Sequence, residues 1–322
     1  MELYDGHTTH PDAQWFPKAE LGLFLHWGIS SVHGNIDLSW GMFRDFKWGP
    51  EVIPPEEYFD LAKRFNPKKY DPEKWIKAAS DAGFKYAVLT TRHHDSFALW
   101  PSDFGDFNTG RYMDGRDLVG EYVKACRRYG MKVGFYYSPP DFRTQRKYMS
   151  FGGWYADRKE DLIVPQVYTD YMRAIVRGQL TELLTRYGVI DLLWFDGAGL
   201  DYMSRDEIYY YQPSVVIGRG EMTDFLSTEC TIPTEEYYHE NLEGHWWECC
   251  HEWNCGGWGY TRDEVYKSAE TIMDFYKTVV VKYHGNLLIN IGPNADGELP
   301  PVAYERLSEF GEMLKEYKKS GQ

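Results

Sequence analysis

A carboxylate stands directly after an apolar segment near the middle of the chain. The stretch YGVIDLLWFDGAG, residues 187–199, is apolar enough to predict a buried strand, and it ends on Asp196, which Gly197 follows. A charged group is costly inside a packed sheet. Asp196 therefore indicates either a cap for the next helix or the floor of a cleft where the strand leaves the core.

Four other apolar segments also end in polar side chains. If these strands are parallel, their carboxyl ends meet at one face, where barrel enzymes bind their substrates. The pair His93 and His94 has a second interpretation, because neighbours on a strand face opposite ways and one of them would lie in the core. The polar groups at these ends are His26, Arg92, His93, His94, Asp95, Tyr136, Tyr137, Ser138 and Arg219.

A repeated pattern predicts the elements that hold these side chains in place. Amphipathic helices are expected from about 72 to 82, 116 to 129 and 165 to 187, and each is followed by a glycine and an apolar strand. A glycine just after the last turn is typical of a left-handed helix cap. The glycines expected in this role are Gly83, Gly130, Gly188 and Gly285.

Helices that alternate with short apolar strands predict a parallel sheet covered by helices. About seven strand candidates over 322 residues favour an α/β fold of the (β/α)8 barrel type, forming one domain over residues 1–322. No GxGxxG motif follows a strand, which disfavours a doubly wound dinucleotide-binding fold.

Composition narrows the class of protein. The net charge of -14 opposes binding to nucleic acid, and no apolar run is long enough to span a membrane. The start of the chain has no basic segment followed by an apolar one, so we expect a cytoplasmic protein with five reduced cysteines. The 12 Trp, 26 Tyr and 17 Phe suit either sugar faces or a large core.

Five ordered motifs carry a family resemblance. They are WFPKAELGLFLHWGISSVHG, YAVLTTRHHDSFALWPS, GRDLVGEYVKACRRYGMKVGFYYSPPDF, DLLWFDG and NLLINIGPNADGELP. Together they resemble the α-L-fucosidases of glycoside hydrolase family 29 over roughly residues 12–320. The resemblance implies a (β/α)8-like catalytic domain that removes terminal α-L-fucosyl residues from oligosaccharides or glycoconjugates, with retention of configuration. It implies no metal and no cofactor.

The resemblance also implies roles for individual residues. Asp196 matches the nucleophile of the family. We expect a cation such as Arg219 beside it and apolar surroundings around the second carboxylate. The residues that match those holding or surrounding the sugar are His26, Trp40, His93, His94, Tyr137, Trp194 and Arg219.

The second carboxylate, the acid/base, is less clearly marked. Glu229 in DFLSTE is the first candidate, although Thr228 replaces the proline of the family pattern. Glu248 in HWWECC is the second candidate. Three more glutamates remain open, namely Glu221, Glu235 and Glu236.

Two other functions remain open. A metal-dependent barrel hydrolase would use His26, His93, His94 and Asp196 as zinc ligands. A non-catalytic sugar-binding barrel would need the same aromatic and histidine side chains without the carboxylate.

The stretch HWWECCHEWNC suggests a structural zinc site, with candidate ligands His245, Cys249, Cys250, His251 and Cys255. It has no second ligand pair with ordinary spacing, and packed thiols are the simpler interpretation.

The chain ends at Gln322, directly after its last amphipathic helix. Many family members carry a β-sandwich there that packs on the barrel. We therefore expect apolar surface to be covered by a second copy of the chain, giving a homo-oligomer.

Overall fold

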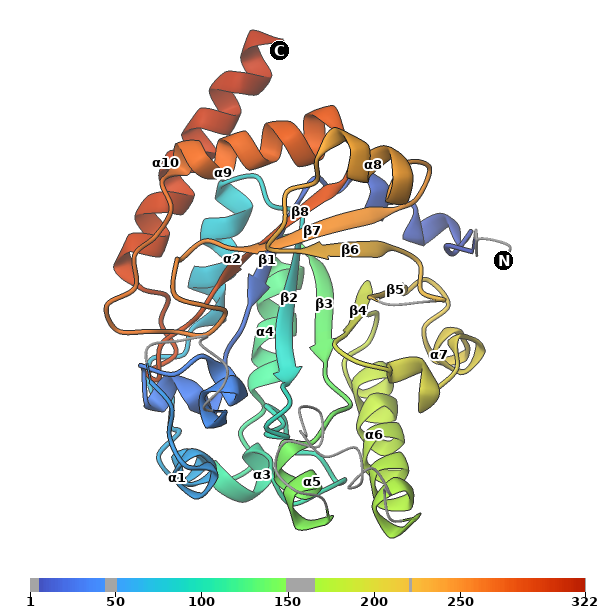
Figure 1. The fold of residues 1–322 in the computed structure, drawn as a ribbon, viewed down its shortest axis with the longest axis vertical. Helices are drawn as coiled ribbons and strands as arrows, with labels where there is room; N and C mark the ends of the chain where they lie inside the picture. Colours follow the sequence, from blue (N-terminus) through green and yellow to red (C-terminus); the bar gives the residue numbers. More distant parts are fainter. Residues whose placement is uncertain (1–5, 44–50, 149–165, 220–221, 322) are drawn as a thin grey trace.

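Eight parallel strands form one sheet that curves into an almost closed barrel (Figure 1). The computed structural model describes residues 6–43, 51–148, 166–219 and 222–321. Within them the strand order is β5-β4-β3-β2-β1-β8-β7-β6, so β5 and β6 are the two edges. The strands are β1 (Leu21–Leu25), β2 (Tyr86–Arg92), β3 (Lys132–Tyr137), β4 (Leu192–Phe195), β5 (Val216–Gly218), β6 (Leu226–Glu229), β7 (Trp247–Glu252) and β8 (Asn286–Ile291). The predicted barrel is confirmed.

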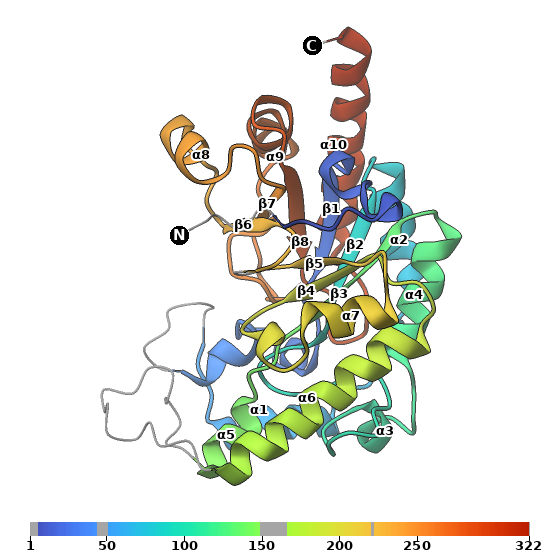
Figure 2. The same ribbon diagram turned by 90° about the vertical axis from the view of Figure 1, so that its right-hand side faces the viewer.

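The helices lie outside the sheet (Figures 1 and 2), and all of the described α-helices lie between two successive strands in the chain except α10, which follows β8. Those expected around 72–82, 116–129 and 165–187 are confirmed as α2, α4 and α6. Among the described residues no helix is both long and apolar enough to cross a membrane. The helices are α1 (Pro55–Asp60), α2 (Pro72–Asp81), α3 (Thr109–Tyr112), α4 (Leu118–Arg128), α5 (Phe142–Tyr148), α6 (Gln166–Arg186), α7 (Arg205–Tyr211), α8 (Glu235–Asn241), α9 (Ala269–Tyr276) and α10 (Pro301–Ser320).

Three of the four expected glycine caps take the left-handed conformation, namely Gly83, Gly130 and Gly188. The prediction for Gly285 was wrong, because His284 has the positive φ of 55° there. Gly285 serves a different purpose. A Cβ built on it would lie 2.3 Å from the Trp247 indole, so only glycine lets the chain pass this ring.

Two apolar cores hold the barrel together. The larger lies between the sheet and its helices, and the smaller fills the barrel interior. On β4, Leu192 and Trp194 point into the interior while Leu193 and Phe195 join the outer core. This alternation of inward and outward residues decides which strand-end side chains reach the site.

Candidate active site

A cavity of about 180 Å³ opens at the carboxyl ends of the strands. Five aromatic side chains form much of its wall, and two carboxylates, a guanidinium and two imidazoles supply polar groups. Seven of the predicted residues line it: His26, Trp40, His93, Trp194, Asp196, Arg219 and Glu229. Phe24, Tyr136, Cys250 and Trp258 complete the lining.

Asp196 lies in the turn directly after β4. Its amide donates to the Tyr137 carbonyl at 3.1 Å, which extends the β3–β4 pairing by one bond. Gly197 then takes a φ of 111°, a conformation that side chains rarely adopt, and turns the chain away. The carboxylate is therefore left at the floor of the cavity, and the helix-cap interpretation is not needed.

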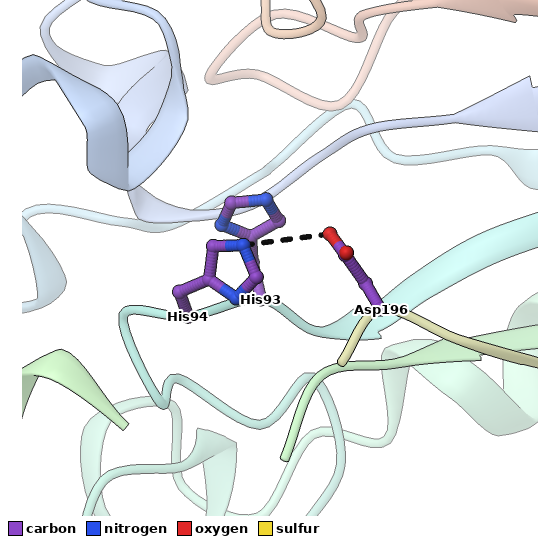
Figure 3. A group of neighbouring side chains, drawn as sticks. All are labelled: His93, His94 and Asp196. Carbon is purple, nitrogen blue, oxygen red and sulfur yellow. Dashed lines mark ion pairs between the residues drawn. The ribbon is translucent and has the colours of Figure 1, made fainter. Parts of the chain in front are cut away.

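Three groups contact the Asp196 carboxylate. The Tyr136 hydroxyl donates to Oδ2 at 2.7 Å, and Nε2 of His94 lies 3.4 Å from the same oxygen (Figure 3). Arg219 approaches the other oxygen, Oδ1, at 3.5 Å. Oδ1 therefore has the weaker contacts and is the freer of the two oxygens.

The histidines in and beside the cavity are neutral. Burial lowers the pKa of His26 to about 4 and that of His94 to about 3. Burial and the neighbouring imidazoles of His94 and His26 also lower the pKa of His93 well below its usual range. A neutral imidazole both donates and accepts, which suits sugar hydroxyls.

One histidine tautomer follows from its neighbour. Nδ1 of His26 lies 2.7 Å from Oδ1 of Asn290, and the amide nitrogen of Asn290 donates to the Trp258 carbonyl. The asparagine oxygen is therefore the acceptor, and Nδ1 of His26 holds the proton. Its Nε2 is left as an acceptor for a ligand. Nδ1 of His93 pairs with the Ser39 hydroxyl at 2.9 Å.

Both neighbours His93 and His94 reach the site, because β2 ends at Arg92 and strand alternation no longer applies. Their rings lie 4.3 Å apart. Nδ1 of His94 pairs with the Ser138 hydroxyl, which directs its Nε2 toward Asp196. The interpretation that placed one of them in the core is wrong.

The prediction that Tyr137 contacts the sugar is wrong, because the neighbouring residue Tyr136 lines the cavity instead. Tyr137 packs outside the sheet, and its hydroxyl donates to Gln179 on α6 at 2.8 Å. Tyr136 instead faces the interior, stacks on Trp194 at 5.4 Å and donates to Asp196. Strand alternation is the physical reason, since adjacent residues on β3 point to opposite faces.

Arg219 joins the two carboxylates of the cavity. Its NH2 lies 2.6 Å from Oε2 of Glu229, and its NH1 lies 3.5 Å from Oδ1 of Asp196. The guanidinium also lies over the Trp194 ring at 5.1 Å. The expected cation beside Asp196 is present, but the apolar surroundings expected for Glu229 are not, because Arg219 pairs with it.

Glu248 does not reach the cavity. It is fully buried on β7, where Tyr86 and the Trp194 indole nitrogen donate to its two oxygens. Burial raises its pKa to about 7. Trp194 lines the cavity, so Glu248 supports that wall from behind.

The other glutamates are less well placed. Glu235 and Glu236 are exposed on α8, and Glu235 pairs with Lys282 at 3.2 Å. Glu221 lies outside the described residues.

Sequence reasoning missed four residues around the cavity: Phe24, Trp258, Cys250 and Asn290. Trp258 lies in a loop that Asp37 keeps in place. The Asp37 carboxylate accepts hydrogen bonds from the backbone amides of Trp258 and Gly259 at 2.9 and 2.8 Å. Only the aromatic WGY stretch could have drawn attention to Trp258. Asn290 acts through His26, a contact between residues 264 positions apart.

Two groups of side chains in the described part of the chain have the types and spacing of metal ligands. One is His93, His94 and Asp196, drawn in Figure 3. His26, the fourth ligand of the metal-hydrolase alternative, is not part of this group, and its Nδ1 contacts Asn290. The second group is Cys230, His251 and Glu252, which differs from the set expected in HWWECCHEWNC.

Comparison with known proteins decides between the alternatives. The family model described as Alpha-L-fucosidase matches residues 4–319. A tissue alpha-L-fucosidase from Rattus norvegicus is 31% identical over 95% of this chain and 69% of its own. The chain belongs to the α-L-fucosidase family. Neither a metal-dependent hydrolase nor a non-catalytic barrel is favoured.

Solved structures of this fucosidase family agree in fold. Alpha-L-fucosidase isoenzyme 1 from Paenibacillus thiaminolyticus has a TM-score of 0.77 at 34% identity, covering 95% of this chain and 75% of its own. A family 29 enzyme from Bacteroides thetaiotaomicron, trapped as a covalent intermediate with 2-fluoro-fucosyl fluoride, has a TM-score of 0.79 at 26% identity. That match covers 99% of this chain and 79% of the other.

Proposed function

We propose that this fucosidase removes terminal α-L-fucosyl residues with retention of configuration, and that Asp196 is its nucleophile and Glu229 its acid/base. The observation that carries the proposal is the pair of carboxylates at one small cavity, joined by Arg219. The covalent intermediate of the Bacteroides relative supports the same mechanism.

In the first step Oδ1 of Asp196, the oxygen with the weaker contacts, attacks the anomeric carbon. The bond from that carbon to the leaving oxygen breaks, and Glu229 donates a proton to the oxygen. Tyr136 and His94 hold the other oxygen of Asp196, so the carboxylate enters the reaction already oriented.

In the second step Glu229 takes a proton from water, which attacks the same carbon and releases Asp196. Two displacements at one carbon restore the original configuration. Glu229 must be protonated to start the cycle, so its pairing with Arg219 opens when the leaving group enters. Arg219 then remains beside Asp196.

The cavity also supports recognition of a deoxy sugar. The wall formed by Trp40, Trp194 and Trp258 suits the apolar face and methyl group of fucose. Neutral His26 and His93 suit its hydroxyls.

The test compares Asp196→Gly with Glu229→Ala, each assayed with and without azide. Loss of the nucleophile is expected to lower the rate by ~10³-fold or more, and azide then attacks the substrate directly to give the β-fucosyl azide. Loss of the acid/base is expected to give the α-azide, because azide attacks the fucosyl-enzyme. If neither variant is rescued, or wild type yields β-fucose as its first product, the proposed roles are wrong.

We also propose that the protein is cytoplasmic and self-associates. None of its five cysteines forms a disulfide, which supports a reducing compartment.

Self-association is supported by exposed apolar side chains. Val189 and Tyr210 are 60% and 81% exposed. Their segments are adjacent, because the Gln212 side chain at the end of α7 donates to the Gly188 carbonyl. This apolar surface supports a contact between copies. Sedimentation that detects only the 37.8 kDa species at micromolar concentration would contradict self-association.

A further inference from the structure

Three side chains with the chemistry of metal ligands meet beside the cavity, at the carboxyl ends of β6 and β7. Sγ of Cys230 donates to Oε2 of Glu252 at 2.7 Å, and Nδ1 of His251 lies 3.2 Å from the same oxygen. One ligand atom from each of the three residues lies within 4.8 Å of the others. The reaction proposed above uses none of them.

We propose that Cys230, His251 and Glu252 bind a divalent cation of the zinc type, and that binding slows proton donation by Glu229. The set offers sulfur, imidazole nitrogen and carboxylate oxygen, the three ligand types that Zn²⁺ takes in proteins. Cys230 is exposed, so a water molecule has access to a fourth position. The site goes beyond the proposed function, and only its effect on Glu229 rests on it.

The cluster is held in place by its own elements. Cys230 has a φ of 51°, and its amide donates to the Cys250 carbonyl at 2.9 Å, which fixes the turn after β6. The His251 ring stacks on Phe275 at 4.8 Å and is buried. Its Nδ1 also lies 3.1 Å from the Glu252 carbonyl, a contact that the metal would replace.

One cation already stands near the cluster. Nζ of Lys267 donates to the carbonyls of Glu252 and Asn254 at 2.9 and 2.6 Å. It lies 4.0 Å from Oε1 of Glu252, so the shared oxygen Oε2 remains for the metal. Thiolate and carboxylate together carry two negative charges, which exceed the single charge of Lys267.

Binding is a proton exchange without any redox step. The thiol proton that Glu252 now accepts is released to solvent, and the proton that Nδ1 of His251 now shares with the Glu252 oxygens moves through solvent to Nε2. The thiolate, the freed Nδ1 and the carboxylate then bind the cation. Zn–S and Zn–N bonds of about 2.3 and 2.0 Å require small side-chain shifts from the present hydrogen bonds. Cys230 directly follows Glu229, so those shifts act on the acid/base itself.

The binding test is a titration of the full chain with Co²⁺ alone. We expect absorption from thiolate-to-cobalt charge transfer that saturates at one equivalent and is bleached by Zn²⁺. Cys230→Ser is expected to remove this absorption and weaken binding by more than roughly tenfold, since even outer-shell partners of metal ligands change affinity by that factor. The matched control is Cys255→Ser, because Cys255 is also an exposed free thiol but lies outside the cluster.

Several outcomes would overturn the site. They are absence of the charge-transfer band in wild type, its survival in Cys230→Ser, or its loss in Cys255→Ser. Glu252→Gln provides a second variant, which keeps the thiol and is expected to weaken Co²⁺ binding without removing the sulfur band. Circular dichroism of each variant identifies any that fails to fold.

The effect on Glu229 is tested with two substrates. An aryl fucoside with an activated leaving group needs little proton donation, whereas a fucosylated oligosaccharide needs it fully. We expect Zn²⁺ to inhibit hydrolysis of the oligosaccharide more strongly, and chelation to reverse this. Equal inhibition of both substrates would overturn the coupling to Glu229. A chain that binds Co²⁺ but hydrolyses no fucoside would refute the proposed function and leave the site standing.

Discussion

Glu248 is expected to couple the stability of the fold to pH. Its carboxyl group is fully buried, and burial raises its pKa from 4.5 to about 7. Below pH 4.5 the group is protonated in both folded and unfolded chains. Between pH 4.5 and 7 the unfolded chain loses this proton while the folded chain keeps it. The free energy of unfolding therefore falls as the pH rises through this window.

The size of the effect follows from the shift. At 1.36 kcal/mol for each pH unit, a rise from 4.5 to about 7 corresponds to about 3 kcal/mol. Glu248→Gln removes the charge and keeps the shape. Its amide oxygen accepts from the Trp194 indole, and its amide nitrogen donates to the Tyr86 hydroxyl. The free energy of unfolding of the variant, relative to that of wild type, is therefore expected to rise by about 3 kcal/mol between pH 4.5 and pH 8.

The assay is urea denaturation followed by tryptophan fluorescence, repeated on both proteins across this pH range. Other groups titrate in both proteins, so the difference between them isolates Glu248. Glu248→Ala is the harsher control. It leaves the Tyr86 and Trp194 donors unsatisfied, at a cost of about 1–3 kcal/mol each.

Two results would refute this reasoning. The first is a difference in stability between Glu248→Gln and wild type that does not change with pH. The second concerns activity. If Glu248→Gln folds normally but loses hydrolysis of natural linkages, while Glu229→Gln keeps it, then Glu248 is the acid/base and the buried supporting role is wrong.

Further predictions test the placement of single residues. Tyr136→Phe removes a hydrogen bond to a charged group worth about 1.5–3 kcal/mol, so kcat/KM should fall about 10- to 100-fold, whereas Tyr137→Phe should leave it nearly unchanged. Gly197→Ala should lower the free energy of unfolding by about 1–3 kcal/mol in a urea titration, because of its φ of 111°; an unchanged midpoint would contradict this. Since the pKa of His26 is lowered to about 4, the acid limb of kcat/KM above pH 5 should have the same midpoint in His26→Gln as in wild type. A shifted midpoint would mean that His26 titrates in that range.

Much of the fold was determined by the sequence alone, because the signals are local. Amphipathic periodicity, followed by a glycine with positive φ, predicted helices α2, α4 and α6. The alternation of these helices with apolar strands predicted the parallel barrel. The apolar run before Asp196 is also a local signal, and it predicted that a strand ends at the cavity. Strands β6 and β7 were not predicted, because their sequences LSTE and WECCHE carry polar residues where a buried strand is usually apolar.

What only the tertiary structure decided depends on contacts between distant residues. Strand phase placed Tyr136 in the cavity and Tyr137 outside it, and no local pattern distinguishes two neighbouring tyrosines. The two candidate glutamates differ in the same way. Glu229 meets Arg219 at the cavity, while Glu248 is buried between Tyr86, 162 positions away, and Trp194. The cluster of Cys230, His251 and Glu252 exists only because β6 and β7 are paired. Burial and charge at each of these sites depend on strand pairing and barrel curvature, which bring together side chains that lie far apart along the chain.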